Sequence, residues 1–292
     1  MLFRSCYRKA LEIQPDFPAA HSDMIFTLDY LSGSDACVGI GFREHQEERR
    51  RWYERHARRL SPMTDHANEK AAGRKLRIGY SSPYLIRNSA GVSLFLPIIR
   101  NHDRTRFEVH IYSDVRTRDD ITEAFQQTDS IWHDTVGLTD AVLAEKIRAD
   151  GIDVLVDLSG HSTYNRLLTF ARKPAPIQIS AWGHPTGTGL PTMDYLFGDP
   201  VAIPPEVRPF FAETIYDLPC FLGYDPPAVA PPVAPLPASS SSSLTFGCLN
   251  RLSKLSDRSV ALWSQLLGEM PDARLLLKDT QLSDPNECRR VE

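Results

Sequence analysis

The stretch LRIGYSSPYLIRNSAGVS, residues 76–93, predicts the start of an α/β domain. It reads as a strand, LRIGYSS, that breaks at Pro83 and restarts as a helix near Ser89. The turn between a parallel strand and the next helix is a common place to hold an anion or a nucleotide. Neither G-x-G-x-x-G nor G-x-x-x-x-G-K-[ST] follows the strand, so the dinucleotide and P-loop fingerprints are absent.

Strands and helices alternate after this stretch. FEVHIYSD at 107–114, SIWHDTV at 130–136, IQISAWG at 177–183 and MDYLFGD at 193–199 read as strands, with helical patterns between them. IDVLVDLSG at 152–160 is almost continuously apolar, which is typical of a central strand in a parallel sheet. The alternation predicts a three-layer α/β domain of Rossmann type over residues 76–224.

Upstream of this domain the chain is helical. Residues 1–39 contain A-x-x-L-x-P-D-x-x-x-A-H, which is similar to the junction of two tetratricopeptide repeats and predicts a repeat remnant. Residues 40–75 include FREHQEERRRWYERHARRLSP, which predicts a charged connector helix. Glutamates interleave with its arginines as on a solvated helix face, so we favour this interpretation over an RNA-binding arm.

Downstream of the domain the composition changes abruptly. DPPAVAPPVAPLPASSSSS at 225–243 predicts a linker that prolines stiffen and serines loosen. Residues 244–292 then read as strand, helix and strand, which is less than an α/β domain of ordinary size. We therefore expect only the beginning of a second domain there.

The amino-acid composition indicates which kinds of binding partner are not expected. The chain has 292 residues and a net charge of −4, which gives no reason to expect nucleic acid or an anionic membrane as a partner. No apolar run approaches the roughly 18 residues of a membrane span. The five cysteines are scattered without a C-x-x-C pair, which predicts reduced thiols, a cytoplasmic protein and no structural zinc site.

Candidate binding residues follow the strands, where parallel sheets bind ligands. The loop after 152–160 offers His161 and Thr163, and the loop after 177–183 offers Gly183, His184 and Pro185. Each of these has a structural alternative, since the histidines could serve internal hydrogen bonds and GHP could form a tight turn. Asp157, inside an apolar strand, is interpreted as a buried hydrogen-bonded anchor.

The segment LTFGCLNRLSKLSDRSV places three further polar residues between a strand and a helix. They are Asn250, Arg251 and Lys254, and Ser256 or Asp257 is expected to cap the helix. Cations beside a helix N-terminus suit an anionic leaving group such as a diphosphate. Two solvent-exposed basic residues without a function are the alternative.

These stretches together resemble the O-linked N-acetylglucosamine transferases, enzymes with tetratricopeptide repeats before a split catalytic region. The resemblance rests on LRIGYSSPYL, NHDRTRFEVHIYSD, RADGIDVLVDLSGHSTYNRL, ARKPAPIQISAWGHPTGTGLPTMDY and FGCLNRLSKLS. It implies a GT-B arrangement of two Rossmann-like lobes and inverting transfer of N-acetylglucosamine from UDP-GlcNAc to protein Ser or Thr hydroxyls. It also implies no metal or other cofactor, and repeats that guide the acceptor protein.

The resemblance also implies residue roles. Lys254 would stabilise the leaving diphosphate, with Arg251 and Asn250 beside it, while Gly183, His184 and Pro185 would line the sugar–phosphate pocket. His161 and Thr163 would lie in the adjacent loop.

The chain departs from the family pattern at two positions of its opening stretch. Asn88 stands where the family usually has an active-site histidine, and Tyr84 stands where an acidic residue is common. The family's uridine pocket lies in the part of the second lobe that has no match here. A non-catalytic homologue that binds proteins through its repeats is therefore the alternative, and a glucosyl- or fucosyltransferase of the same fold is a third.

Overall fold

The computed structural model describes residues 2–31, 41–87, 91–183, 185–223, 225–226, 229–240 and 243–291. The chain divides into two compact units. The first combines Met1–Thr27 with Gly41–Ala228, and the second combines Leu28–Ile40 with Val229–Glu292.

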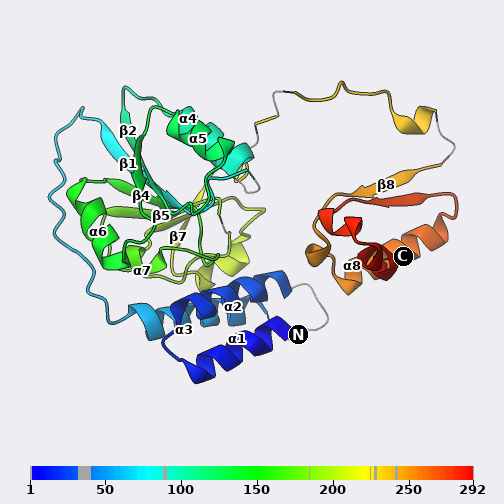
Figure 1. Ribbon diagram of the computed structural model, residues 1–292, viewed down its shortest axis with the longest axis horizontal. Coiled ribbons are helices and arrows are strands. Elements are labelled where there is room, and N and C mark those ends of the chain that lie inside the picture. Colours follow the sequence, from blue (N-terminus) through cyan, green and yellow to red (C-terminus); the bar gives the residue numbers. More distant parts are fainter. Residues whose placement is uncertain are drawn as a thin grey trace. The chain divides into compact units, whose positions relative to one another are not determined.

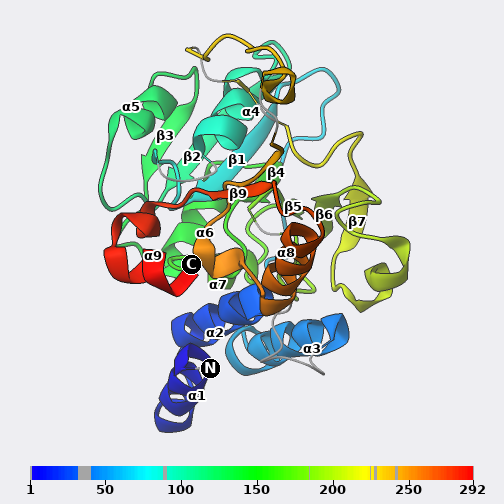
Figure 2. The same ribbon diagram turned by 90° about the vertical axis from the view of Figure 1, so that its right-hand side faces the viewer.

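A parallel sheet forms the centre of the first unit, and seven of its strands lie within the described residues. Their order is β3-β2-β1-β4-β5-β6-β7 (Figure 2). The strands are β1 (Leu76–Ser82), β2 (Phe107–Ser113), β3 (Ile131–Asp134), β4 (Val154–Asp157), β5 (Ile177–Ser180), β6 (Tyr195–Gly198) and β7 (Thr214–Asp217). The order reverses between β1 and β4, as in a doubly wound Rossmann sheet. The predicted fold class is confirmed, although β7 was not foreseen.

Helices cover both faces of this sheet (Figure 1). One face carries the π-helix η3 (Gly91–Phe95), α4 (Leu96–Arg100) and α5 (Asp120–Gln126), and the other carries α6 (Asp140–Ala149) and α7 (Leu167–Phe170). Successive residues of β4 point to opposite cores: Leu155 packs with α6 and α7, and Val156 packs with α4 and α5. Burial on both faces is the reason for the apolar run in this strand.

The N-terminal helices belong to the same unit as the sheet, except for the last four residues of the second helix, which are assigned to the second unit. They are α1 (Leu2–Ile13), α2 (Pro18–Leu31), α3 (Phe42–Trp52) and a π-helical turn, η2 (Tyr53–Ala57). Ile25 and Trp52 are part of the core beneath α6 and α7. Arg50 and Arg51 are exposed, as a solvated helix face requires, but Arg49 is only 1% exposed. The expectation of a solvated connector is therefore wrong at Arg49.

The second unit contains a two-stranded parallel sheet among its described residues, made of β8 (Thr245–Cys248) and β9 (Arg274–Leu277). A 3-10 turn (Leu252–Lys254) and α8 (Asp257–Glu269) connect the two strands, and α9 (Pro285–Val291) follows. The Ser256 side chain accepts a hydrogen bond from the Ser259 N–H, so Ser256 is the predicted cap of α8.

Candidate functional site

The switch point between β1 and β4 positions the loops that the sequence singled out. Ser81, Asp157 and Ser180 lie side by side where β1, β4 and β5 end. Ligands of open α/β sheets bind outside the carboxyl ends of the strands at such a switch point. The loops after β1, β4 and β5 therefore form the candidate site of the first unit.

Asp157 shapes the loop after β4. One carboxylate oxygen accepts the Ser159 N–H at 3.0 Å, and the other accepts the Gly160 N–H at 2.8 Å and the Ser180 hydroxyl at 3.3 Å. The side chain is buried, and burial raises the pKa of Asp157 to about 6. These contacts agree with its interpretation as an anchor that turns the chain toward His161.

His161 occupies the interior behind the loops. Its exposure is 1%, and its ring meets Trp52 edge to face with the centroids 5.3 Å apart. Nε2 lies 2.8 Å from the Thr188 carbonyl oxygen, to which it donates, and Nδ1 lies 3.2 Å from the Ser22 hydroxyl. His161 thus joins α2, the loop after β4 and the loop after β5. This geometry favours a positioning role over direct contact with a donor.

Gly183 brings the loop after β5 against the loop after β4. A Cβ at this position would lie 2.0 Å from the Leu158 carbonyl oxygen, so only glycine fits. Trp182 beside it has a φ of 51°, a left-handed conformation that is uncommon for a bulky residue. Gly183 and Pro185 are exposed at the candidate site. His184 lies outside the described residues.

Three side chains from other elements hold the loop after β5, and sequence analysis missed all of them. Arg49 donates to the Gly187 carbonyl oxygen at 3.0 Å and to the Thr186 hydroxyl at 2.6 Å. The Gln46 amide donates to the Thr186 carbonyl oxygen at 2.8 Å. The available signal was the spacing of His45, Arg49 and Trp52 at i, i+4 and i+7, which puts Arg49 on the same helix face as a buried tryptophan.

Glu213, directly before β7, is the third of these side chains. Its Oε1 accepts both the backbone N–H and the hydroxyl of Thr188 at 2.5 Å. The Thr188 carbonyl oxygen also accepts a hydrogen bond from His161. The loop after β5 is therefore held by residues from α3, from the loop after β4 and from the segment directly before β7. No sequence signal marked Glu213, because it depends on a strand that was not foreseen.

Tyr84 and Thr163 join the loops after β1 and β4. The Tyr84 hydroxyl donates to the Thr163 carbonyl oxygen at 2.8 Å, and the Thr163 hydroxyl donates to Asp23 of α2 at 2.9 Å. Burial raises the pKa of Tyr84, so its hydroxyl keeps the proton that it donates. Thr163 is exposed, whereas Asn88 lies outside the described residues.

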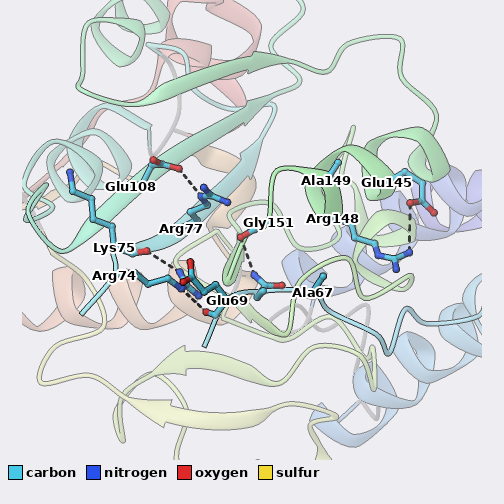
Figure 3. A pocket seen from close by; sticks show the side chains of 11 residues that line it. Ala67, Glu69, Arg74, Lys75, Arg77, Glu108, Glu145, Arg148, Ala149 and Gly151 are labelled. Carbon is cyan, nitrogen blue, oxygen red and sulfur yellow. Dashed lines mark hydrogen bonds and ion pairs between the residues drawn. The ribbon is translucent and has the colours of Figure 1, made fainter. Parts of the chain in front are cut away.

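Two cavities of the first unit differ in their position relative to this site: one lies beside it and the other lies far from it. One of about 340 Å³ lies between α2 and the loop after β4, where Asp23 and Thr163 line it. A larger one of about 680 Å³ lies at the opposite, amino-terminal edge of the sheet (Figure 3). Its arginines are neutralised by carboxylates, for example Arg77 by Glu108 at 2.9 Å. The larger cavity is therefore a poor site for an anionic sugar nucleotide.

In the second unit the three predicted polar residues share one loop. Asn250, Arg251 and Lys254 are all exposed between β8 and α8. The Leu252 N–H donates to Asp279, which follows β9, at 2.5 Å, so the ends of both strands are tied together. The loop leads into the capped N-terminus of a helix of 13 residues, an environment that favours anions.

Comparisons with known proteins place the chain in a family. The model of glycosyl transferase family 41 matches residues 57–223. The chain is 34% identical, over 93% of its length, to the probable UDP-N-acetylglucosamine–peptide N-acetylglucosaminyltransferase SPINDLY of Oryza sativa. It is 34% identical over 91% of its length to the protein of the same name from Arabidopsis thaliana.

A solved structure shares both fold and sequence with the chain. A mutant of the O-GlcNAc transferase from Thermobaculum terrenum superposes with a TM-score of 0.89 and 36% identity over 99% of this chain. The chain spans 54% of that structure and 29% of the rice and Arabidopsis relatives. The family model covers more than half of the present sequence, and the chain belongs to glycosyl transferase family 41.

Proposed function

We propose that this chain is part of an enzyme that transfers N-acetylglucosamine from UDP-GlcNAc to Ser or Thr hydroxyls of proteins with inversion. The acceptor oxygen bonds to the anomeric carbon and loses its proton, while the bond to the diphosphate breaks and UDP leaves with the electron pair. The proposal rests on the names of the relatives together with one observation: the loops at the switch point are held by buried hydrogen bonds yet expose Gly183 and Pro185.

Each predicted site residue has a place in this proposal. Lys254 would neutralise charge on the departing diphosphate, and Asn250 and Arg251 would bind it from the same loop. Gly183, His184, Pro185 and Thr163 would line the sugar–phosphate pocket, with His161 positioning the two loops behind them. Asn88 would occupy the place of the family's histidine.

The surroundings of the reaction are proposed on the same basis. The N-terminal helices would receive the acceptor protein, and no metal or other cofactor is assigned to the transfer step. Within the described residues, no helix has the length and apolarity to cross a membrane. The cytoplasm is the proposed compartment because four of the cysteines carry free thiols.

A non-catalytic, protein-binding homologue is the second candidate. Asn88 favours it, because an asparagine side chain cannot titrate near neutral pH.

Radiolabelled sugar transfer to a Ser/Thr peptide separates the two candidates. We expect the chain extended with a complete second lobe to incorporate label, and Lys254→Ala to lower the rate by about 10²–10³-fold. Arg274→Ala is the matched control, because this exposed cation lies at the other end of the two-stranded sheet and should leave the rate unchanged. Equal incorporation by Lys254→Ala and the unmodified protein would remove the role of Lys254.

Donor choice and the role of Asn88 are tested in the same assay. UDP-GlcNAc should be preferred over UDP-glucose and GDP-fucose, and preference for another sugar would contradict the proposed donor. Asn88→His should raise the rate. No incorporation from any donor, with peptide binding retained, would identify the non-catalytic homologue.

A further inference from the structure

Two histidines and an aspartate converge in the first unit at a place that the proposed transfer does not use. His110 lies in the middle of β2, His133 lies in β3, and Asp150 directly follows α6. Their potential ligand atoms all lie within 4.8 Å of one another. His133 Nε2 is 3.0 Å from His110 Nδ1 and 3.8 Å from Asp150 Oδ2. The group is nearer the amino ends of the strands than the loops of the candidate site.

These separations are close to those of a tetrahedral zinc site. With bonds of about 2.0–2.1 Å, neighbouring ligand atoms of such a site lie about 3.3 Å apart. The two imidazole nitrogens are already near that distance at 3.0 Å. The carboxylate oxygen, 3.8 Å from His133 Nε2, must move closer to complete the set. Two imidazoles with one carboxylate are also a donor set that zinc commonly takes.

The surrounding residues orient the histidines as metal ligands are oriented. Glu108 Oε1 accepts from His110 Nε2 at 3.1 Å, which leaves the lone pair of Nδ1 directed into the cluster. Arg77 holds Glu108 in turn at 2.9 Å (Figure 3). His133 stacks on the Tyr112 ring with centroids 4.7 Å apart and planes within 9°. Both rings are thus held close together, and a bound ion would replace the hydrogen bond between His110 Nδ1 and His133 Nε2 after a small turn of each ring.

The negative charge of Asp150 could bind a divalent cation, provided that this cation displaces the ammonium group of Lys146. The Tyr112 hydroxyl donates to Asp150 Oδ2 at 2.7 Å, and Lys146 Nζ lies 3.1 Å from the same oxygen. The C-terminus of α6 adds partial negative charge from its carbonyl groups. The Lys146 side chain is 35% exposed and can turn to solvent when a divalent ion takes its place.

We propose that His110, His133 and Asp150 bind one zinc ion, with a solvent molecule as fourth ligand, and that this ion ties β2, β3 and the end of α6 together. The site is structural and independent of the sugar-transfer residues. The expectation of no structural zinc site considered cysteine ligands, whereas the ligands proposed here are two histidines and an aspartate. No metal is assigned to the sugar-transfer step.

A second histidine pair in the same unit supplies the matched control. His21 Nδ1 and His56 Nε2 also lie 3.0 Å apart. The carboxylates there bind the outer ring nitrogens, Glu48 on His21 Nε2 at 2.9 Å and Asp16 on His56 Nδ1 at 3.4 Å. They do not converge with the inner pair, so this pair should not bind zinc.

The test is calorimetric titration of the metal-free 292-residue chain with zinc chloride, followed by cobalt(II) absorption spectroscopy. We expect one ion per chain, visible cobalt bands of a tetrahedral nitrogen–oxygen site, and a melting temperature that rises with zinc. His133→Phe keeps the ring on Tyr112 and should weaken zinc binding at least about 100-fold. Glu108→Gln should weaken it by about 10–100-fold, and His56→Phe should leave it unchanged.

The possible results separate cleanly. Zinc binding that survives in both His133→Phe and Asp150→Asn, or that is lost in His56→Phe, would overturn the proposal. So would sulfur-to-cobalt charge-transfer bands, since they would assign the ion to the free thiols. If His133→Phe does not fold, as judged by circular dichroism, Asp150→Asn decides alone, because it keeps the size of the side chain. Absence of binding to the unmodified chain would leave a hydrogen-bonded histidine pair and disprove the site.

Discussion

The two units of the chain bury their apolar residues to very different extents. In the first unit Ile147, Leu155 and Phe170 are completely buried between the sheet and its helices. In the second unit α8 has no buried residue among those described, and Leu262 and Leu276 are each 58% exposed. Both units repeat the same strand–helix–strand pattern, so the local pattern is not the cause of the difference.

The cause is the number of layers around each sheet. A seven-stranded sheet between two layers of helices removes both of its faces from water, whereas the two described strands of the second unit, with α8 and α9, cannot do so. Stability should therefore be concentrated in the first unit, with local unfolding cheapest in the second. Three pairs of substitutions and one comparison across pH test this contrast.

Loss of a core side chain should show the contrast most strongly. Phe170→Ala should lower the free energy of unfolding of the first unit by about 3–5 kcal/mol, because it leaves a cavity in a core that is fully buried. Leu262→Ala in α8 should cost less than about 1 kcal/mol, since most of that side chain is already in water. Urea unfolding with hydrogen exchange to assign each unit measures both, and equal costs would refute the contrast.

Adding a methyl group should have opposite effects in the two units. Gly183→Ala should destabilise the first unit by about 3 kcal/mol, because the new Cβ meets a backbone carbonyl. Gly268→Ala in α8 meets nothing within 4 Å and should stabilise that helix by about 0.5–1 kcal/mol. Thermal melts of the two variants check the signs. A stable Gly183→Ala protein would show that the loops after β4 and β5 can separate.

A buried acid should make only the first unit sensitive to pH between about 4 and 6. Burial raises the pKa of Asp157 from 3.8 to about 6, so the folded state keeps a proton that the unfolded chain releases in this range. Its contribution to the free energy of unfolding is therefore largest below pH 4 and falls as pH rises toward 6. No carboxyl group that the structure describes in the second unit is buried.

The comparison with Asp157→Asn isolates this contribution, because histidines that titrate in the same range affect both proteins equally. Between about pH 4 and 6.5, wild type should lose on the order of 2 kcal/mol relative to the variant in urea unfolding. A constant difference across that range would show that Asp157 stays ionised in the fold.

Helix caps should give the smallest effects. Thr139→Ala removes the cap that accepts the Val142 N–H in α6, and Ser256→Ala removes the cap that accepts the Ser259 N–H in α8. Each should cost about 1 kcal/mol in its own unit. Hydrogen exchange should show Ser256→Ala opening α8 alone. Faster exchange in the first unit would mean that the two units unfold together.

Local patterns explain most of what sequence analysis recovered. The continuous apolar run of β4, the anchoring role of Asp157 and the cap Ser256 each follow from residues within a few positions of one another. The strand at 214–217 was missed because its four residues carry no clear alternation, and its pairing with β6 depends on the completed sheet.

The same distinction between local pattern and tertiary contact applies to the loops after β4 and β5. Their positions after β4 and β5 followed from the chain order of strands and from the resemblance, and Gly183 was named among them. The reason for that glycine was not visible, since it depends on the carbonyl oxygen of Leu158 in another loop.

The Rossmann class, the order of the elements and the family could be predicted from the amino-acid sequence, because hydrophobic periodicity and motifs are properties of neighbouring residues. Three other features became visible only in the folded molecule: Arg49 is buried, His161 joins α2 to two loops, and His110 lies beside His133 and Asp150. Arg49 and its partner Gly187 are 138 positions apart, and the pair forms only when the sheet brings distant segments together. A contact of that kind leaves no periodic trace in the chain, since its energy arises from the packing of the completed fold.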